Sequence, residues 1–306
     1  KETVGCHHEK EWTPVTGEAA YLGGPLWQCG RITLAKEILK ELGTDEHWPQ
    51  PSGSIREKRV IRKLWAGALV LSDWIASREE HSYPQGEQRE LASELLQDAG
   101  FDLRTEVKKT NFSDLFGYAP RRLQEEVSRL YKGPGIYVLE APTGYGKTEA
   151  ALALATQALA KGDADGLYFA LPTQLTSNRM VDRVRDYVAA LYGEEKIVRL
   201  LHGGARTTAL RMGKDAAPGE DWFRPNRQAL LAPFSVGTVD QALLASLPVR
   251  FSSLRLAGLA GKVVFFDEIH SYDTYTSELI RKLLQDLRTL KAVVVILSAT
   301  LTNGTL

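Results

Sequence analysis

The chain has 306 residues, which is long enough to bury a sizeable core and to form more than one domain. Its composition, 43% hydrophobic and 25% charged, is typical of a globular protein and argues against disorder. Lys plus Arg equals Asp plus Glu at 38 each, so net charge gives no argument for a nucleic-acid partner, and any such contact must come from a local surface.

No apolar run approaches the ~20 residues that cross a bilayer, and the polar start is not a secretory signal. Two cysteines do not form a disulfide framework, which fits a reducing cytoplasm. The first residue is Lys1 rather than Met, so we expect the sequence to be a piece of a longer protein. We predict a cytoplasmic protein without membrane contact.

Residues 1–110 are predicted to be mostly helical, with short helices over 34–42 and 91–99. A longer helix is expected over 55–76, because apolar residues recur there at helical spacing. Its apolar face is expected to consist of Val60, Ile61, Leu64, Ala68, Leu71 and Ile75.

Two features of this part could carry chemistry. One is the adjacent pair His7-His8; the other is Asp73, which has apolar neighbours in the long helix, where an unpaired carboxylate would be costly. Metal coordination would satisfy Asp73, but so would a buried Arg partner or a helix cap. The residues alone favour structural roles, and a zinc site with Cys6 is less favoured still because no Cys-x-x-Cys spacing accompanies it.

From about residue 111 the pattern changes, and apolar runs alternate with helical segments. Runs that are apolar throughout are typical of parallel strands buried on both faces. The expected strands are 136–139, 167–171, 197–201, 230–236, 263–266 and 292–297, and the expected helices are 148–160, 174–191, 239–247 and 274–290. This alternation predicts an α/β fold with a doubly wound parallel sheet that binds ligands at the carboxyl ends of its strands. Residues 203–228, rich in Gly, Arg and Pro, are expected to form a surface insertion.

A glycine-containing turn joins the first expected strand to the first of these helices. It reads Ala141-Pro142-Thr143-Gly144-Tyr145-Gly146-Lys147-Thr148, and the order strand, glycine turn, helix indicates a phosphate-binding loop that holds a nucleotide. The glycines lack Cβ, so the backbone can reach positive φ and turn its N–H groups toward phosphate oxygens. Ala141 replaces the first glycine of the usual pattern, and a chance glycine turn is the alternative.

The side chains of this loop complete the predicted nucleotide site. Lys147 is expected to supply a positive charge to the β- and γ-phosphates, and the Thr148 hydroxyl is expected to ligate Mg²⁺. The helix that follows presents free N–H groups and the positive end of its dipole to the same phosphates. The predicted nucleotide-binding residues of the loop are Thr143, Gly144, Tyr145, Gly146, Lys147 and Thr148.

An acidic pair, Asp267-Glu268, directly follows the expected strand 263–266. Because the carboxyl ends of parallel strands lie at one edge of the sheet, we expect this pair beside the phosphate loop. Asp267 is predicted to hold the Mg²⁺ that Thr148 also binds, and Glu268 to orient or deprotonate the attacking water. The alternative is an ordinary N-cap for the next helix.

Three other strand tips carry polar side chains. Ser298 and Thr300 end the last strand, where small hydroxyl residues can sense the acidic pair and pass its state on. Hydroxyl and amide groups at the other two tips suit sugar-phosphate contacts that do not depend on sequence. These candidate nucleic-acid residues are Pro172, Thr173, Gln174, Thr238, Asp240 and Gln241. Helix capping explains Thr173 and Thr238 equally well.

The order of these motifs over residues 118–306 resembles the first RecA-like domain of a superfamily 2 helicase. Gln124 matches the adenine-reading glutamine of that family. The other matches are 141–148 with motif I, 172–174 with motif Ia, 237–240 with the next DNA-side motif, 267–270 with motif II and 298–300 with motif III. Three longer stretches are similar to the CRISPR-associated helicase-nuclease of type I systems: 171–180, 236–243 and 267–273.

The resemblance changes the interpretation of residues 1–110, because that family carries an HD-type metal nuclease domain ahead of its helicase. His7, His8 and Asp73 fit the last metal ligands of that domain, so the resemblance implies a divalent transition metal held by them. The earlier ligands of the family, a His and a His-Asp pair, have no counterpart here and are expected before residue 1. Residues 111–306 would form the first RecA-like domain, and the second, which completes the ATP cleft, is expected beyond this chain.

The function implied is that of an ATP-dependent DNA helicase coupled to a metal-dependent nuclease, which degrades foreign DNA in CRISPR antiviral defence. The implied cofactors are ATP, Mg²⁺ and the transition metal, and the implied partners are single-stranded DNA and an RNA-guided surveillance complex. His270, Ser298 and Thr300 would couple the ATP site to the DNA contacts. The protein is expected to be a monomer in a prokaryotic cytoplasm. A helicase without nuclease activity and a nucleotide-dependent recruitment module are the alternatives.

Overall fold

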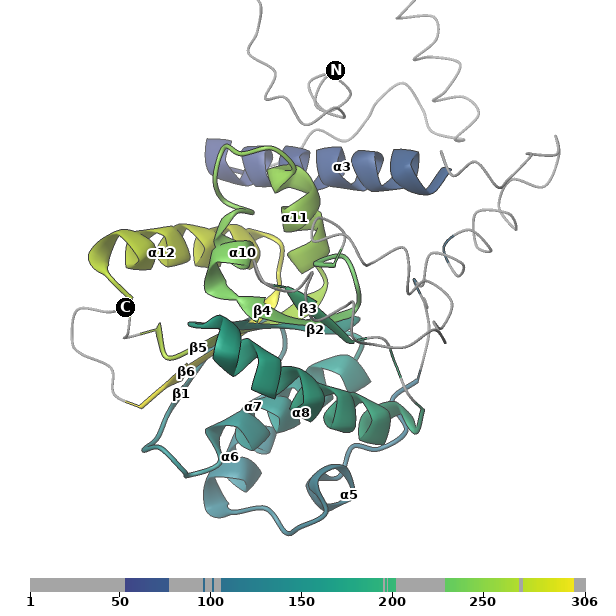
Figure 1. Cartoon of the computed structure of the whole chain (residues 1–306), viewed down its shortest axis with the longest axis vertical. Helices are drawn as coiled ribbons and strands as arrows, with labels where there is room; N and C mark the ends of the chain where they lie inside the picture. The colour runs from purple at the N-terminus through teal and green to yellow at the C-terminus, as the bar shows by residue number, and fades with distance from the viewer. Residues whose placement is uncertain are drawn as a thin grey trace, which may run out of the picture.

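The computed structural model of the chain describes residues 53–76, 96, 101, 106–194, 196, 198–201, 229–269 and 272–299. Within them, a central sheet has helices on both of its faces (Figure 1). The predicted helix over 34–42 and the predicted insertion over 203–228 lie outside the described residues, as does the helix over 91–99 apart from residue 96.

The described part of the chain forms a six-stranded sheet in the order β1-β6-β5-β2-β4-β3, and each neighbouring pair is parallel. The strands are β1 (Gly135–Glu140), β2 (Gly166–Leu171), β3 (Val198–Leu201), β4 (Phe234–Thr238), β5 (Lys262–Asp267) and β6 (Val293–Ser298). This order confirms the predicted α/β fold with a parallel RecA-like sheet.

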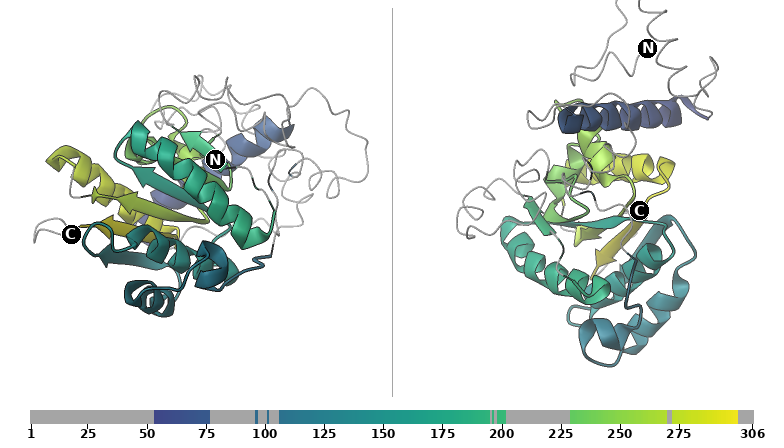
Figure 2. Two further views of the ribbon diagram at one scale, coloured as in Figure 1. Left: turned by 60° about the horizontal axis from the view of Figure 1, so that its bottom comes forward. Right: turned by 90° about the vertical axis from the view of Figure 1, so that its right-hand side faces the viewer.

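The helices divide between the two faces of the sheet (Figures 1 and 2). They are α3 (Ile55–Ala76), α5 (Phe112–Phe116), α6 (Arg122–Leu130), α7 (Lys147–Ala160), α8 (Gln174–Tyr192), α10 (Val239–Leu243), α11 (Ser252–Leu259) and α12 (Thr274–Thr289). One face packs against α7 and α8, with α5 and α6 beside them, and the other against α10, α11 and α12.

Side chains alternate between these two apolar layers along the central strands. On β2, Phe169 enters the layer of α7 and α8, where its ring stacks on Phe265 at a centroid distance of 4.6 Å, whereas Tyr168 enters the opposite layer. Helices cover both faces of the central strands, so these strands are buried on both faces as predicted. The edge strand β1 is different: Ile136 and Val138 are 42% and 39% exposed, so the prediction is wrong there.

Two element boundaries also differ from those that the apolar pattern predicts. The strand expected from residue 230 begins at Phe234, because the chain first makes a buried turn. The helix expected over 239–247 ends at Leu243, and a separate helix, α11, follows it. Apolar composition alone does not distinguish a buried turn from a strand.

The buried turn is held by Lys262 at the start of β5. Its Nζ donates to the carbonyl oxygens of Leu230 and Ala232 at 2.6 and 2.5 Å, and to Ser235 Oγ at 3.4 Å. These carbonyls therefore have partners although they lie outside the sheet. Burial lowers the pKa of Lys262 from 10.5 to about 7, because an enclosed ammonium loses its hydration.

Helix α3 lies across the outside of the layer formed by α10, α11 and α12 (Figure 2). Its bounds match the predicted ones, but its buried face is shifted, because Ala68 is exposed. The fully buried apolar positions of α3 are Val60, Ala66, Val70 and Ile75. Trp74 extends this contact, with its ring edge against Phe251 at a centroid distance of 5.5 Å.

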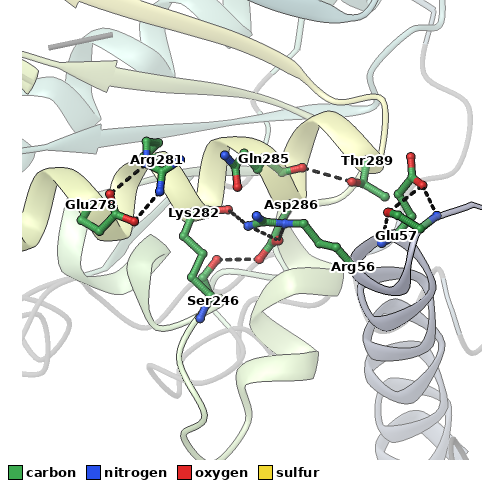
Figure 3. A network of polar contacts seen from close by, with 10 residues as sticks. Arg56, Glu57, Ser246, Glu278, Arg281, Lys282, Gln285, Asp286 and Thr289 are labelled. Carbon is green, nitrogen blue, oxygen red and sulfur yellow. Dashed lines mark hydrogen bonds and ion pairs between the residues drawn. The ribbon is translucent and has the colours of Figure 1, made fainter. Parts of the chain in front are cut away.

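Two contacts fix α3 on this layer. Gly67 lets α3 approach α11, since a Cβ there would clash with the Ser253 carbonyl oxygen and lie 2.8 Å from the Ala257 Cβ. Near the start of α3, Arg56 donates from Nε and Nη2 to Asp286 Oδ1 on α12 at 3.3 Å (Figure 3). Ser246 Oγ donates to the other oxygen of this buried carboxylate at 3.0 Å. The charge of Asp286 is therefore paired and hydrogen-bonded.

A Gly67→Ala substitution tests the close approach by the sign of its effect. In an exposed helix, Gly to Ala stabilises by about 1 kcal/mol; here we expect a loss of about 1–3 kcal/mol from overpacking. Urea unfolding measures the difference. The control is Ser72→Ala on the exposed face of the same helix, expected to stay within about 0.5 kcal/mol, and a Gly67→Ala variant more stable than wild type would contradict the close contact.

The buried Lys262 predicts a pH-dependent stability. Between pH 7 and 10.5 the unfolded lysine keeps its proton while the folded one has released it, so the free energy of unfolding should rise with pH. A Lys262→Met variant should lack this contribution, so wild type should gain stability relative to it from pH 7 to 9. Urea unfolding at several pH values measures this, with exposed Lys132→Met as control. Parallel pH profiles of wild type and Lys262→Met would show that folded Lys262 keeps its proton.

Candidate active site

The predicted phosphate loop joins β1 to α7 at the carboxyl edge of the sheet. Gly144 and Gly146 have φ of 84° and 78°, as predicted for backbone N–H groups that turn toward an anion. Gly146 precedes the first residue of α7, so the free N–H groups of that helix face the same point. Thr143 and Tyr145 are exposed on the loop surface.

Lys147 lies at the start of α7 with its side chain folded back along the loop. Its Nζ donates to the Ala141 carbonyl oxygen at 2.5 Å, which places the ammonium beside the loop N–H groups. Thr148 follows in the first helical turn and is partly exposed. The loop therefore gathers a cation, a hydroxyl and a set of backbone donors, which is the donor set that phosphate groups require.

Gln124, on α6, contacts this loop and is 1% exposed. Its Oε1 accepts from the Arg121 N–H at 2.8 Å, and its Nε2 donates to the Gly146 carbonyl at 3.4 Å. Arg121 also reaches the loop, through Nη1 to the Gly144 carbonyl at 3.2 Å. Both ends of the Gln124 amide thus bond within the protein, which gives it a positioning role and leaves adenine reading a prediction.

The acidic pair lies at the tip of β5, where the sequence predicted it. Asp267 ends the strand, and Glu268 follows with φ of 54°, a left-handed conformation that is costly for a side chain other than glycine. Helix α12 is capped instead by Asp273, whose Oδ1 accepts from the Thr276 N–H at 2.9 Å. The alternative interpretation of the pair as the N-cap of that helix is therefore wrong.

Strand β6 joins the phosphate loop to the acidic pair. The Ala141 N–H donates to the Ser298 carbonyl at 3.3 Å, and the Glu268 N–H donates to the Leu297 carbonyl at 3.0 Å. Ser298 is fully buried between them. At ~4.8 Å per strand, the tips of β1 and β5 lie ~10 Å apart, so Thr148 and Asp267 offer a hydroxyl and a carboxylate, both ligands that Mg²⁺ accepts, at one edge of the sheet.

The tips of β2 and β4 carry the residues predicted to contact nucleic acid. Thr173 caps α8, because its Oγ1 accepts from the Thr176 N–H at 3.2 Å, which supports the capping interpretation of its side chain. Gln174 and Asp240 are exposed, and Pro172 is partly exposed. Thr238 precedes α10 without a side-chain capping bond and is 7% exposed.

Two residues that sequence reasoning missed position the tip of β4. Tyr168 on β2 donates from its buried hydroxyl to the Thr238 carbonyl at 2.9 Å. Arg255 on α11 donates from Nη1 to Gln241 Oε1 at 3.1 Å. Each is a polar residue inside an apolar run, and this was the only signal in the sequence. Gly237 permits the approach, since a Cβ there would lie 2.8 Å from the Tyr168 hydroxyl.

Of the three predicted ligands of the transition metal, the structure describes only Asp73. That residue is exposed on α3, so the expectation of apolar surroundings is wrong, while a ligand role stays a prediction. His7 and His8 lie outside the described residues, and so do the predicted coupling residues His270 and Thr300. Among the residues that the structure describes, no group of three or more His, Cys, Asp or Glu side chains could hold a metal ion.

Comparisons with known proteins point to a helicase. The family model of the DEAD/DEAH box helicases matches residues 121–306. A CRISPR-associated endonuclease/helicase Cas3 from Thermus thermophilus is 36% identical over 307 residues, which is 90% of this chain and 33% of that protein. A CRISPR-associated nuclease/helicase Cas3 from Streptococcus thermophilus is 34% identical, with the same coverage.

Solved structures agree with these relatives. T. fusca Cas3 with AMPPNP has a TM-score of 0.83 and 31% identity, covering 99% of this chain and 36% of that one. A chain of a CRISPR RNA-guided surveillance complex in a pre-nicking state has a TM-score of 0.62 and 30% identity, with 99% and 33% coverage. The chain thus spans about a third of the length of its curated relatives. No described helix is long and apolar enough to span a membrane.

A Gly146→Ala substitution tests the geometry of the phosphate loop. Its Cβ would clash with Gln124 Nε2 and force a left-handed alanine, so we expect at least a tenfold loss of ATP affinity in the intact protein. The matched control is Gly162→Ala, which has a φ of 71° but no atom within 4 Å of the added Cβ. Titration with a fluorescent ATP analogue measures both, and equal affinities would contradict the assignment.

Proposed function

The chain belongs to the DEAD/DEAH box helicase family, and we propose that it forms the ATP-binding half of a DNA motor that works with a metal-dependent nuclease in CRISPR defence. The observation that carries this proposal is the placement of the phosphate loop and the Asp267-Glu268 pair on either side of β6. The similarity to Cas3 proteins over almost the whole chain supports the defence role.

In the proposed reaction, the loop N–H groups and Lys147 bind the phosphates of ATP. Thr148 and Asp267 would hold Mg²⁺, which neutralises charge on the transferring phosphoryl group when it is bound. Glu268 orients the attacking water and accepts its proton. Gln124 holds Gly146 in place and is proposed to read adenine, as its counterpart does in the family that the sequence resembles. A hydrolysing site also needs groups from a second RecA-like domain.

The tips of β2 and β4 are proposed to contact the sugar-phosphate backbone of single-stranded DNA. Two observations support this: Gln174 and Asp240 are exposed at those tips, and Gln241 is fixed by Arg255. Contacts of this kind do not read bases, which suits a motor that must move along any sequence. Ser298, beside the acidic pair, is proposed to relay the state of the ATP site together with His270 and Thr300.

The nuclease activity is proposed from the relatives, which carry the names endonuclease/helicase and nuclease/helicase. His7, His8 and Asp73 would supply part of the ligand set for a divalent transition metal. The exposure of Asp73 favours an accessible role over a core one. A helicase without nuclease activity is the second candidate, since the family model that matches residues 121–306 is that of a helicase.

An RNA-guided surveillance complex is the proposed partner. The support is the similarity to a chain of a solved CRISPR RNA-guided surveillance complex in its pre-nicking state. Such a partner would deliver opened target DNA, and the motor would then draw in the displaced strand for degradation.

Separate variants should split the two activities of the intact protein. Lys147→Ala removes the charge that binds the phosphates, so we expect ATP-driven DNA degradation to fall at least 100-fold while nicking of single-stranded DNA continues. Gel assays of a labelled strand, with and without ATP, measure both. The control is Lys132→Ala, an exposed lysine beyond the end of α6. Loss of both activities in Lys147→Ala would contradict separate centres.

Asp73→Ala provides the reciprocal test. Losing one proposed metal ligand should reduce metal-dependent cleavage at least 10-fold, because supporting and direct ligands both affect metal affinity. ATP hydrolysis stimulated by DNA should persist. Ser72→Ala, a neighbouring exposed position, is the control. Unchanged cleavage in Asp73→Ala would favour the helicase without nuclease activity.

A further inference from the structure

Arg255 is a charged residue of α11 that is only 9% exposed. Its Nη1 donates to Gln241 Oε1 at 3.1 Å and to the Gln241 backbone carbonyl at 3.5 Å, so one nitrogen contacts both the side chain and the backbone of the same residue. Burial removes the hydration of a guanidinium, which therefore needs acceptors within the protein. The contact joins α11 to α10, the short helix that follows the tip of β4 on the proposed DNA side.

This contact determines which end of the Gln241 amide faces away from the protein. An amide has an oxygen that accepts and a nitrogen with two N–H donors, whereas a guanidinium has donors only. The amide atom beside Arg255 must therefore be the oxygen, because a reversed amide would place donor against donor. Within the part of the chain that the structure describes, Gln241 Nε2 has no hydrogen bond and is not among the buried atoms without a partner. Its two N–H groups are thus open to a ligand.

The helix that carries Arg255 is packed closely at two places. Gly67 of α3 lies against the Ser253 carbonyl, where an added Cβ would clash. Gly258 lies against the buried turn, since a Cβ there would be 2.9 Å from the Leu230 carbonyl oxygen. Close packing restricts α11, so Arg255 holds the amide from a fixed point. A group fixed in advance loses less conformational entropy when it binds a ligand.

We propose that Arg255 is a positioning residue, which fixes Gln241 as a hydrogen-bond donor to the phosphate oxygens of a single strand. This inference rests on the proposed function and assigns the direction of one hydrogen bond within it. A phosphodiester oxygen only accepts, so an amide that presents its N–H groups can bind it, and an amide that presents its oxygen cannot. Arg255 also strengthens these donors, because a hydrogen bond to the amide oxygen polarises the whole amide.

The neighbouring carboxylate is compatible with this contact. Asp240 is exposed and would repel a phosphate directly opposite it. Consecutive residues of a helix point ~100° apart, however, so Asp240 and Gln241 leave α10 in different directions. A phosphate bound at the Gln241 amide therefore lies away from the direction of the Asp240 side chain.

The structural alternative is that Gln241 only provides an acceptor for a buried guanidinium. In that case the oxygen of the amide matters and its nitrogen does not. The two interpretations differ when the outer end of the side chain is changed and the end that faces Arg255 is kept.

A Gln241→Glu substitution in the intact protein makes this change, because it keeps an oxygen toward Arg255 and replaces the N–H groups with a second, negatively charged oxygen. We expect the Kd for a labelled single-stranded oligonucleotide to rise about tenfold or more, since a bond to a charged acceptor is lost and repulsion replaces it. Fluorescence anisotropy at one fixed salt concentration measures it. Thermal stability should be unchanged or higher, because the contact with Arg255 becomes an ion pair. An unchanged Kd would overturn the proposal.

Gln157→Glu is the matched control for the added charge. Gln157 is partly exposed on α7, which covers the opposite face of the sheet from α10. Charges far apart on the surface are screened by salt, so we expect its Kd to stay within about twofold of wild type. An equal rise of Kd in both variants would show a general effect of charge and would overturn the assigned contact.

A double-mutant cycle tests whether Arg255 acts through Gln241. Arg255→Met leaves the amide free to turn, so Kd should rise about threefold or more. In a Gln241→Met background the same change at Arg255 should weaken binding no further, whereas a further loss of equal size would overturn the positioning role. The Gln241→Glu measurement does not depend on the folding of Arg255→Met, since Gln241→Glu keeps the buried arginine paired.

The same assay separates this inference from the proposed function. Wild-type protein that fails to bind the oligonucleotide would contradict the proposed DNA contact itself. Binding that is present in wild type and unaffected by Gln241→Glu would contradict only the role of the amide.

Discussion

The backbone hydrogen bonds of β6 are the constraint on which the active site depends. The phosphate loop follows β1 and the acidic pair follows β5, and these strands do not pair with each other. The register of β6 sets Ser298 opposite Glu140 and Leu297 opposite Asp267, so the two halves of the site end level with each other. A slip of one residue would turn every side chain of the strand to the other face. The distance between the phosphate loop and the acidic pair is therefore set by the backbone geometry of the sheet.

The second organising feature is α11, which connects distant parts of the chain. Helix α3 packs closely against α11 at Gly67, and Arg255 of α11 donates a hydrogen bond to Gln241. The ion pair between Arg56 and Asp286 adds α12, the helix that follows the acidic pair. The helix that carries Asp73 is thus packed on the same layer that positions the tip of β4, which gives a proposed nuclease segment and a proposed DNA contact a common support.

The sequence predicted the features whose signals are local. The glycine loop, the acidic strand tip and the central buried strands each depend on a few adjacent residues, and the structure has them where they were expected, whereas β1 is partly exposed and β4 begins only at Phe234. The prediction of apolar surroundings for Asp73 was wrong, because its apolar neighbours in sequence point to other sides of the helix and do not surround it. Other residues act through partners that are distant in the sequence: Lys262, Tyr168, Arg255 and Gln124. A single sequence does not show which distant residues are in contact.

Steady-state phosphate release by the intact protein, with and without single-stranded DNA, tests the central claim most directly. A motor whose ATP site lies at the same edge of the sheet as the strand tips proposed to contact DNA should hydrolyse ATP slowly alone and at least tenfold faster with single-stranded DNA. Tight ATP binding with the same slow release in both conditions would contradict the account, and would indicate a module that binds nucleotide without doing work on DNA.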